Sequence, residues 1–214
     1  AIGHELGVAY SYGNLGMIAD AGGDPSAATS LYTHALSMFR RLGDETSEGY
    51  MLGNLGLVLL DAGALDEAES FTHQSLALYR RLGNDDSCGY SLSTLGEIAL
   101  LRGDIAGAEH YGEEALTIRA GIGHQSGIAK QFECAADVAL AKSEPERAIT
   151  LFGAAARLRM EIGNPNEPRF DERFARIGNA VRSELGSDRY SAAWERGVSL
   201  TTDEAISFTR ARGT

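Results

Sequence analysis

The sequence predicts an all-α fold in which helical hairpins stack into an α-solenoid. Three observations support this prediction: marker residues recur every 40 positions, apolar residues are spaced three or four apart, and glycines occupy fixed places in the period. Apolar spacing of three and four indicates amphipathic helices. A repeat of this length indicates units that bury their apolar faces by stacking on their neighbours.

The period of 40 residues is visible in three markers. A Gly-Asn-Leu-Gly run at 13–16 returns at 53–56 and, in altered form, at 93–96 and 133–136. An alanine recurs at 28, 68, 108 and 148, and a Leu-Gly or Ile-Gly pair recurs at 42–43, 82–83, 122–123 and 162–163. The same count reaches Ile2-Gly3, so we expect residues 1–3 to end an earlier repeat and the chain to be a fragment of a longer array.

Each unit is expected to form two helices. In the first unit Tyr12, Leu15, Gly16 and Ala19 form one apolar stripe, and a second stripe begins at Ala28. The same pattern in every unit predicts helices close to residues 5–21, 25–42, 45–62, 65–82, 85–102, 105–122, 125–142 and 145–162.

Capping residues mark the ends of these helices. Asp24 is placed to cap a second helix, Pro25 suits its first turn, and Gly43 suits its C-terminal end. In the fourth unit Ser143, with Glu146 three residues later, is expected to take the capping role of Asp24.

Small residues inside the stripes predict close packing between helices. They are Gly16, Gly56 and Gly96 on the first helices and Ala28, Ala68 and Ala108 on the second helices. A glycine inside a helix costs about 1 kcal/mol relative to alanine. The return of glycine at the same position of three repeats therefore implies that close packing offsets this cost.

These residues resemble the tetratricopeptide repeat, whose pattern is aromatic-x2-Leu-Gly followed by Ala-x3-aromatic. Tyr12, Leu15 and Gly16 match the first part, and Ala28 and Tyr32 match the second. The long period resembles the kinesin-light-chain variety. The resemblance implies four repeats over 1–163, with units at about 4–43, 44–83, 84–123 and 124–163.

The tail, residues 164–214, breaks the period and is expected to cap the array with further helices. After a turn-rich break at 164–168, one helix is predicted from Phe170 to Leu185, a second around Trp194, and a third behind a Thr201–Glu204 capping box. Residues 146–155 and 193–206 resemble the extreme C-terminus of large bacterial LuxR-type and related signal-transducing ATPase regulators. This resemblance implies that the chain is the last part of a transcriptional regulator.

Composition argues against several functions. The net charge of −11 opposes direct binding to nucleic acids and to anionic membranes. The two cysteines have no paired spacing, and we expect a cytoplasmic location with no metal site. No nucleotide loop, HExxH or GxSxG motif is present. We therefore expect no cofactor and no enzymatic activity.

The candidate recognition surface lies on the first helix of each unit. A rotation of 100° per residue places Tyr10, Asn14 and Met17 about 200° from the packing stripe. The equivalents in later units are Tyr50, Asn54, Leu57, Tyr90, Thr94, Glu97, Lys130 and Asp137. The resemblance to tetratricopeptide proteins implies that this face lines a concave groove and that the asparagines contact the backbone of a bound peptide.

Alternatives to the groove remain open at this stage. The tyrosines could pack on neighbouring hairpins, and the asparagines could tie helices together. The expected partner is a protein or peptide, which includes other domains of the same full-length chain. A small-molecule inducer stacked on the tyrosines and a self-association arm that forms homo-oligomers are the competing hypotheses.

Overall fold

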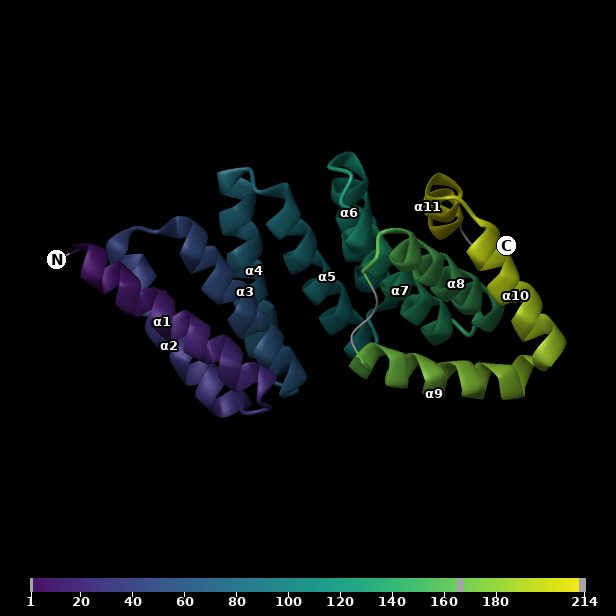
Figure 1. Cartoon of the computed structure of the whole chain (residues 1–214), viewed down its shortest axis with the longest axis horizontal. Coiled ribbons are helices and arrows are strands. Elements are labelled where there is room, and N and C mark those ends of the chain that lie inside the picture. The colour runs from purple at the N-terminus through teal and green to yellow at the C-terminus, as the bar shows by residue number, and fades with distance from the viewer. Residues whose placement is uncertain (1, 165–167, 212–214) are drawn as a thin grey trace. The chain divides into compact units, whose positions relative to one another are not determined.

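The computed structural model describes the backbone of residues 2–164 and 168–211 and the side chains of residues 3–164 and 174–211. Over these residues the regular structure is helical, which confirms the all-α prediction (Figure 1). The chain divides into two compact units, Ala1–Ile98 and Ala99–Thr214. None of the described helices is long and apolar enough to span a bilayer.

The first unit consists of α1 (Ile2–Ala21), α2 (Pro25–Leu42), α3 (Glu45–Asp61), α4 (Leu65–Leu82) and most of α5 (Asp85–Leu101). Helix α1 lies along α2, α2 packs against α3, and α3 lies along α4 (Figure 1). The core of the unit is built from side chains such as Tyr32, Phe39, Leu52 and Leu55, which are almost fully buried.

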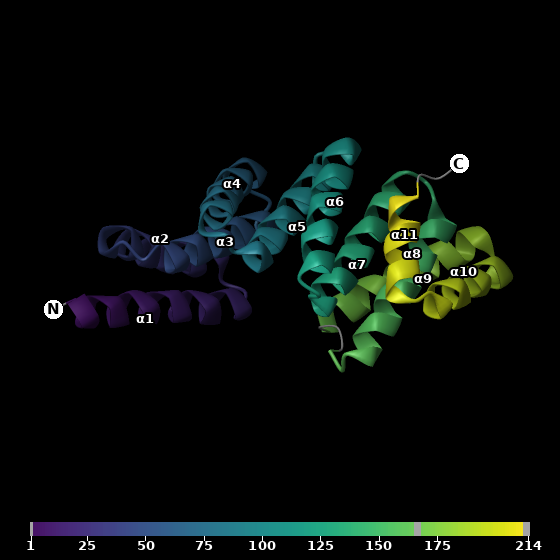
Figure 2. The same cartoon turned by 90° about the horizontal axis from the view of Figure 1, so that it is seen from above.

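The described part of the second unit contains the end of α5, α6 (Ile105–Gly121), α7 (Gln125–Ala141), α8 (Pro145–Glu161), α9 (Pro168–Leu185), α10 (Ser187–Ser199) and α11 (Thr202–Arg210). Helix α7 lies along α8, and α8 also packs against α10. The short helix α11 rests on α7 and α8 (Figure 2).

The repeat helices begin and end close to the predicted residues. Helices α2 to α8 agree with the prediction to within one residue at each end. Helix α1 begins at Ile2 instead of residue 5, so it is three residues longer at its start than predicted. Gly43 ends α2 in the left-handed conformation, and its amide bonds back to Arg40 and Phe39.

Left-handed residues recur every twenty positions, one after each repeat helix. Seven are glycines, at positions 23, 43, 63, 83, 103, 123 and 163, with φ between 63° and 77°. The eighth position is Ser143, which has a φ of 60°. The prediction that Ser143 caps α8 is therefore wrong: it ends α7, and the N-cap of α8 is Glu144, which makes no side-chain capping bond.

Other capping predictions are confirmed. The Asp24 carboxylate accepts a hydrogen bond from the Ala27 amide at 2.9 Å. Thr201 and Glu204 form the predicted capping box at the start of α11. These side chains satisfy amides that have no partner within the helix.

The small residues permit close helix packing, as predicted. A Cβ atom on Gly16 would lie 2.6 Å from the Tyr32 ring, and one on Gly56 would overlap the Thr72 hydroxyl. Leu15 departs from the predicted packing stripe because it is 51% exposed, whereas its equivalent Leu55 is buried. Leu55 belongs to the hydrophobic core of the first unit, and Leu15 does not.

The backbones of α8 and α10 lie close together where glycines replace larger side chains. A Cβ atom on Gly153 would lie 2.8 Å from the Trp194 carbonyl oxygen, and one on Gly197 would overlap the Thr150 carbonyl oxygen. Part of the predicted break, residues 165–167, and the side chain of Phe170 lie outside the described residues. The four-unit division and the capping role of residues 164–214 remain predictions.

Candidate functional site

Large side chains form an exposed row on the first helices of the first unit. Tyr10 and Met17 come from α1, Tyr50 and Leu57 from α3, and Tyr90 from α5, and each is between 44% and 55% exposed. We call this row, together with Asn14, Asn54 and Glu97, the tyrosine face. Exposed apolar side chains that gather on one surface often mark an interaction site.

Tyr10 is held in place by the loop that enters α3. Its hydroxyl donates to the Asp44 carboxylate at 3.1 Å and lies 3.2 Å from the Ser47 hydroxyl. The edge of its ring meets Phe39, with the ring centroids 5.1 Å apart. Tyr10 therefore does pack on the neighbouring hairpin, yet 46% of it stays exposed. The prediction that it faces a partner and the alternative that it packs are both compatible with this geometry.

Asp44 links Tyr10 to the start of α3. Its carboxylate accepts hydrogen bonds from the Ser47 amide at 3.1 Å and the Ser47 hydroxyl at 2.7 Å. Partial burial is the largest single influence and acts to raise the pKa of Asp44. The hydrogen bonds from Ser47, Tyr10 and the Thr46 amide together outweigh it and leave this pKa below its ordinary value.

A small hollow of about 110 Å³ lies between α1 and α3. Tyr10, Asn14, Met17 and Tyr50 surround it, with Phe39 and Met51 among its lining residues. Gly13 contributes no side chain, and a Cβ atom there would already lie 3.3 Å from the Met51 sulfur. The hollow thus has an apolar floor, since Phe39 and Met51 are buried, and a rim with polar groups.

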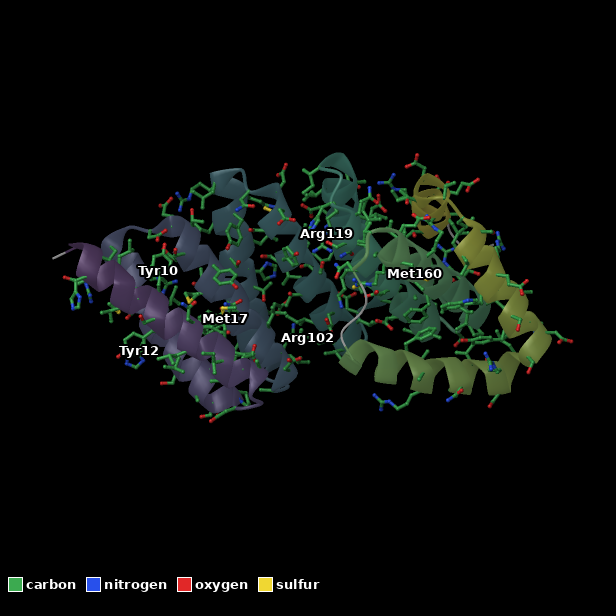
Figure 3. All side chains as sticks on the ribbon, viewed as in Figure 1. Tyr10, Tyr12, Met17, Arg102, Arg119 and Met160 are labelled. Atoms are coloured by element: carbon green, nitrogen blue, oxygen red, sulfur yellow. The ribbon has the colours of Figure 1, made fainter. Side chains whose placement is uncertain are left out.

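Tyr50 continues the row from α3 toward α1. Its hydroxyl points at the Met17 sulfur, 3.7 Å away. Tyr10 and Met17 lie on the side of α1 that faces α3, whereas Tyr12 lies on another side (Figure 3). There the Tyr12 ring stacks on His34 of α2, with the ring centroids 5.4 Å apart.

The two predicted asparagines have different environments. Asn14 is exposed beside the hollow. Asn54 is half-buried, and its Nδ2 atom is buried without a hydrogen-bond acceptor among the described residues. Buried side-chain donors are normally satisfied. Asn54 therefore holds a buried, unused donor about one helical turn from the exposed residues Tyr50 and Leu57.

The part of the face on α5 differs from the prediction at Thr94. Thr94 is only 7% exposed, and its hydroxyl donates to the Tyr90 carbonyl oxygen at 3.2 Å. A β-branched hydroxyl readily makes this bond to the preceding helical turn. Thr94 is thus buried and bonded within its own helix, and the exposed residues of α5 at this face are Tyr90 and Glu97.

The remaining predicted residues, Lys130 and Asp137, lie on α7 in the second unit, where both are half-buried. Between them Glu133 is 2% exposed and accepts a hydrogen bond from Arg159 Nε of α8 at 2.6 Å. Sequence reasoning missed this buried ion pair. Among the described residues no cluster of three His, Cys, Asp or Glu side chains is arranged to hold a metal ion.

Buried Arg119 is a second feature that sequence reasoning missed. It has no exposed surface, and its NH1 atom donates to the Gly127 carbonyl oxygen at 2.8 Å. The period contains the signal that could have revealed it, because Arg119 and Arg159 stand at the phase of the buried aromatics Phe39 and Tyr79. An arginine at a repeat position that holds a buried aromatic ring in other repeats indicates that its guanidinium is also buried.

Residues 47–120 match the tetratricopeptide repeat family. The match covers α3 to α6 and includes Tyr50, Asn54, Leu57, Tyr90 and Glu97 of the tyrosine face. No curated protein sequence matches the chain. Tetratricopeptide repeats generally mediate protein–protein interactions.

Two solved structures with tetratricopeptide-like repeats share this fold. Both come from a protein of Podosopora anserina classed as a kinesin light chain with nearly identical repeats. The Q17M form is 17% identical, covers 91% of this chain and 94% of its own, and has a TM-score of 0.64. The other form is 18% identical, covers 95% and 97%, and has a TM-score of 0.61. These similarities confirm the predicted tetratricopeptide fold.

Proposed function

We propose that this chain is a non-catalytic interaction module that binds a peptide or protein segment on the tyrosine face. The face combines exposed aromatic and aliphatic side chains with two asparagine amides, and an amide can both donate to and accept from a peptide backbone. Tetratricopeptide arrays use their inner surfaces in this way.

The unsatisfied Nδ2 donor of Asn54 carries this proposal. A buried donor without a partner costs about 1–3 kcal/mol. This atom has almost no accessible surface in the free chain, so a backbone carbonyl of a bound segment supplies the missing acceptor only after the Asn54 side chain turns outward. Replacing Asn54 with alanine is therefore expected to leave the free protein as stable as before, or more stable, and to weaken only the bound state.

The hollow beside Tyr10 argues against the alternative of a small-molecule inducer site at this place. Pockets for small molecules usually have volumes of about 300–1,000 Å³. The hollow has about 110 Å³ and is lined by Phe39 and Met51, so it suits a single side chain of a larger partner.

Selection from a random peptide display library on the full chain tests the proposal. Peptides enriched on the parent protein should bind the Asn14→Ala/Asn54→Ala variant at least tenfold more weakly. The Asn179→Ala variant is the matched control, because Asn179 is exposed on α9 in the second unit. Equal binding to the parent and both variants would remove the asparagines from the site, provided that circular dichroism shows equal helicity.

The proposal extends to the protein from which the chain derives. The two segments that resemble bacterial LuxR-type regulators, 146–155 and 193–206, are in contact, because the Thr150 hydroxyl donates to the Ala193 carbonyl oxygen. We therefore propose a cytoplasmic sensor or scaffold region of a bacterial transcriptional regulator. A helix-turn-helix domain and a nucleotide-binding domain encoded upstream of Ala1 would support this origin.

Self-association is a second candidate function, favoured by one observation. Leu15 and Ile18 on α1 are 51% and 67% exposed, and their equivalents Leu55 and Val58 are buried. A second copy could cover this pair. Sedimentation velocity over a hundredfold range of concentration tests this alternative, because a monomer at every concentration would exclude it.

A further inference from the structure

The charge of the first unit points to the chemistry of its partner. Residues 1–98 contain four arginines and no lysine against 13 aspartates and glutamates. Three of the arginines form ion pairs: Arg40 with Glu48, Arg41 with Glu5, and Arg81 with Glu45. The field of this unit is therefore strongly negative, and it attracts cationic segments and repels acidic ones.

The tyrosine face shares this negative character. Glu97 is exposed at the phase that Met17 and Leu57 occupy in the first two hairpins, and Asp44 lies beneath the Tyr10 hydroxyl. The face itself contains no lysine or arginine. The exposed ring of Tyr50 also offers a π surface, which attracts ammonium and guanidinium groups.

The hollow between α1 and α3 indicates which type of side chain the partner inserts there. Its apolar floor favours an aliphatic side chain over a polar one. Its volume of about 110 Å³ is smaller than the ~150 Å³ of an apolar protein cavity known to hold benzene. A valine- or leucine-sized group therefore fits better than an aromatic ring.

From these observations we infer that the tyrosine face binds a cationic peptide segment with one aliphatic anchor. The anchor enters the hollow between Tyr10 and Tyr50, and a lysine or arginine of the segment lies beside Glu97. The backbone of the segment passes Asn54 and accepts its Nδ2 hydrogen bond. This inference rests on the proposed function and adds the charge class of the partner and the order of its residues.

The length of the segment follows from helix packing. Side chains of α1 contact α3 directly, and packed helices lie about 10 Å apart, so we take about 10 Å for each step along the first helices α1, α3 and α5. The hollow lies between α1 and α3, so it is about one and a half steps, or roughly 15 Å, from Glu97 on α5. An extended chain rises about 3.3 Å per residue, so the anchor and the cation are expected to be about five residues apart.

Labelled twelve-residue peptides test the inference on the full chain by fluorescence anisotropy. One peptide carries a leucine and, five residues away, two lysines in a Gly-Ser-Gln background, and its matched variants carry glutamates or glutamines in place of the lysines. Both chain directions are included. The lysine peptide should bind at least tenfold more tightly than the glutamate peptide. Its affinity should fall severalfold between 50 and 300 mM salt, because exposed charges are then screened.

Substitutions in the protein and in the peptide locate each contact. Glu97→Gln should weaken the lysine peptide about three- to fivefold and leave the glutamine peptide unchanged. Glu195→Gln is the matched control, because Glu195 is exposed on α10 in the second unit. Replacing the leucine of the peptide with serine should weaken binding about tenfold without any change to the protein.

The outcomes separate this inference from the proposed function. Tighter binding of the glutamate peptide, or equal loss in Glu97→Gln and Glu195→Gln, overturns the cationic partner. If selected peptides are acidic or neutral but still depend on Asn14 and Asn54, the proposed function stands and the charge assignment falls. If no selected or designed peptide binds the chain, both fall together.

Discussion

The two units use one repeat frame but fill its aromatic phase differently. In the first unit, Phe39 and Tyr79 occupy this phase as buried rings. In the second unit the same phase holds Arg119, which bonds to the Gly127 carbonyl oxygen, and Arg159, which pairs with Glu133. The frame therefore specifies where a large side chain is buried and leaves open whether that side chain is apolar or charged.

This difference changes the face on the neighbouring helix. Above Phe39, Gly13 leaves a hollow bordered by exposed Tyr10 and Tyr50. At the phase of Gly13 the second unit has Glu133, whose side chain is buried in the ion pair with Arg159. A glycine at this phase leaves a hollow beside it in the first unit, whereas the glutamate at this phase in the second unit is buried in an ion pair.

The largest expected effect comes from breaking the ion pair of the second unit. Glu133→Ala leaves the Arg159 guanidinium largely buried without its carboxylate, which typically costs about 3–5 kcal/mol. The single tryptophan, Trp194, lies in the second unit and reports on it. Urea unfolding followed by Trp194 fluorescence should therefore show a much lower midpoint.

The apolar replacement Glu133→Leu/Arg159→Met provides the control for this substitution. Removing both charges together leaves no unpaired group, and such replacements are often neutral or stabilising. The double variant should thus regain most of the stability lost in Glu133→Ala. If the double variant is as unstable as the single one, the second unit needs the guanidinium for more than charge pairing.

A smaller effect is expected at the turn between α7 and α8. Ser143 occupies a left-handed conformation that the other seven turns of the series give to glycine. A non-glycine residue there costs about 1 kcal/mol. Ser143→Gly should therefore stabilise the second unit by up to about 1 kcal/mol, which raises Tm by roughly 2–4 °C.

The reverse change one period earlier sharpens this comparison. Gly103 has a φ of 76° in the same unit, so Gly103→Ser should lower Tm by a similar amount. Both variants are measured by thermal unfolding with the Trp194 signal. A loss of stability in Ser143→Gly would show that the serine side chain contributes more than its backbone conformation costs.

Structural features that depend on neighbouring residues, or on the 40-residue repeat, could be predicted from the sequence. Helix ends follow from caps and turn glycines, and the close approach at Gly16 follows from a glycine retained inside an apolar stripe. Ser143 was misinterpreted because serine is a frequent helix cap, although its place in the twenty-residue series already assigned it to the turn.

Long-range pairing could not be predicted in the same way. Arg119 and Glu133 are charged, and charged residues are expected at the surface unless a partner compensates their burial. The partner of Glu133 lies 26 positions away on another helix. Likewise, the Tyr10 bond to Asp44 spans 34 positions. The ladder of tyrosines was visible in sequence, but which of them is tied to a loop depends on these distant contacts.

The smallest expected effect distinguishes a tied tyrosine from an untied one within the first unit. Because the pKa of Asp44 is lowered in the folded state, the unfolded chain binds its proton more readily. The stability that results is complete above the ordinary aspartate pKa of about 3.9 and is lost as pH falls through the lower, folded value. Tyr10→Phe removes one of the hydrogen bonds that lower this pKa. Acid unfolding followed by circular dichroism should then begin at a slightly higher pH, while stability at pH 7 changes by about 0.5 kcal/mol or less.

Tyr50→Phe is the matched control, because the Tyr50 hydroxyl faces the Met17 sulfur and not a carboxylate. Equal acid sensitivity in both variants would mean that the Tyr10 hydroxyl does not contribute to the low pKa of Asp44.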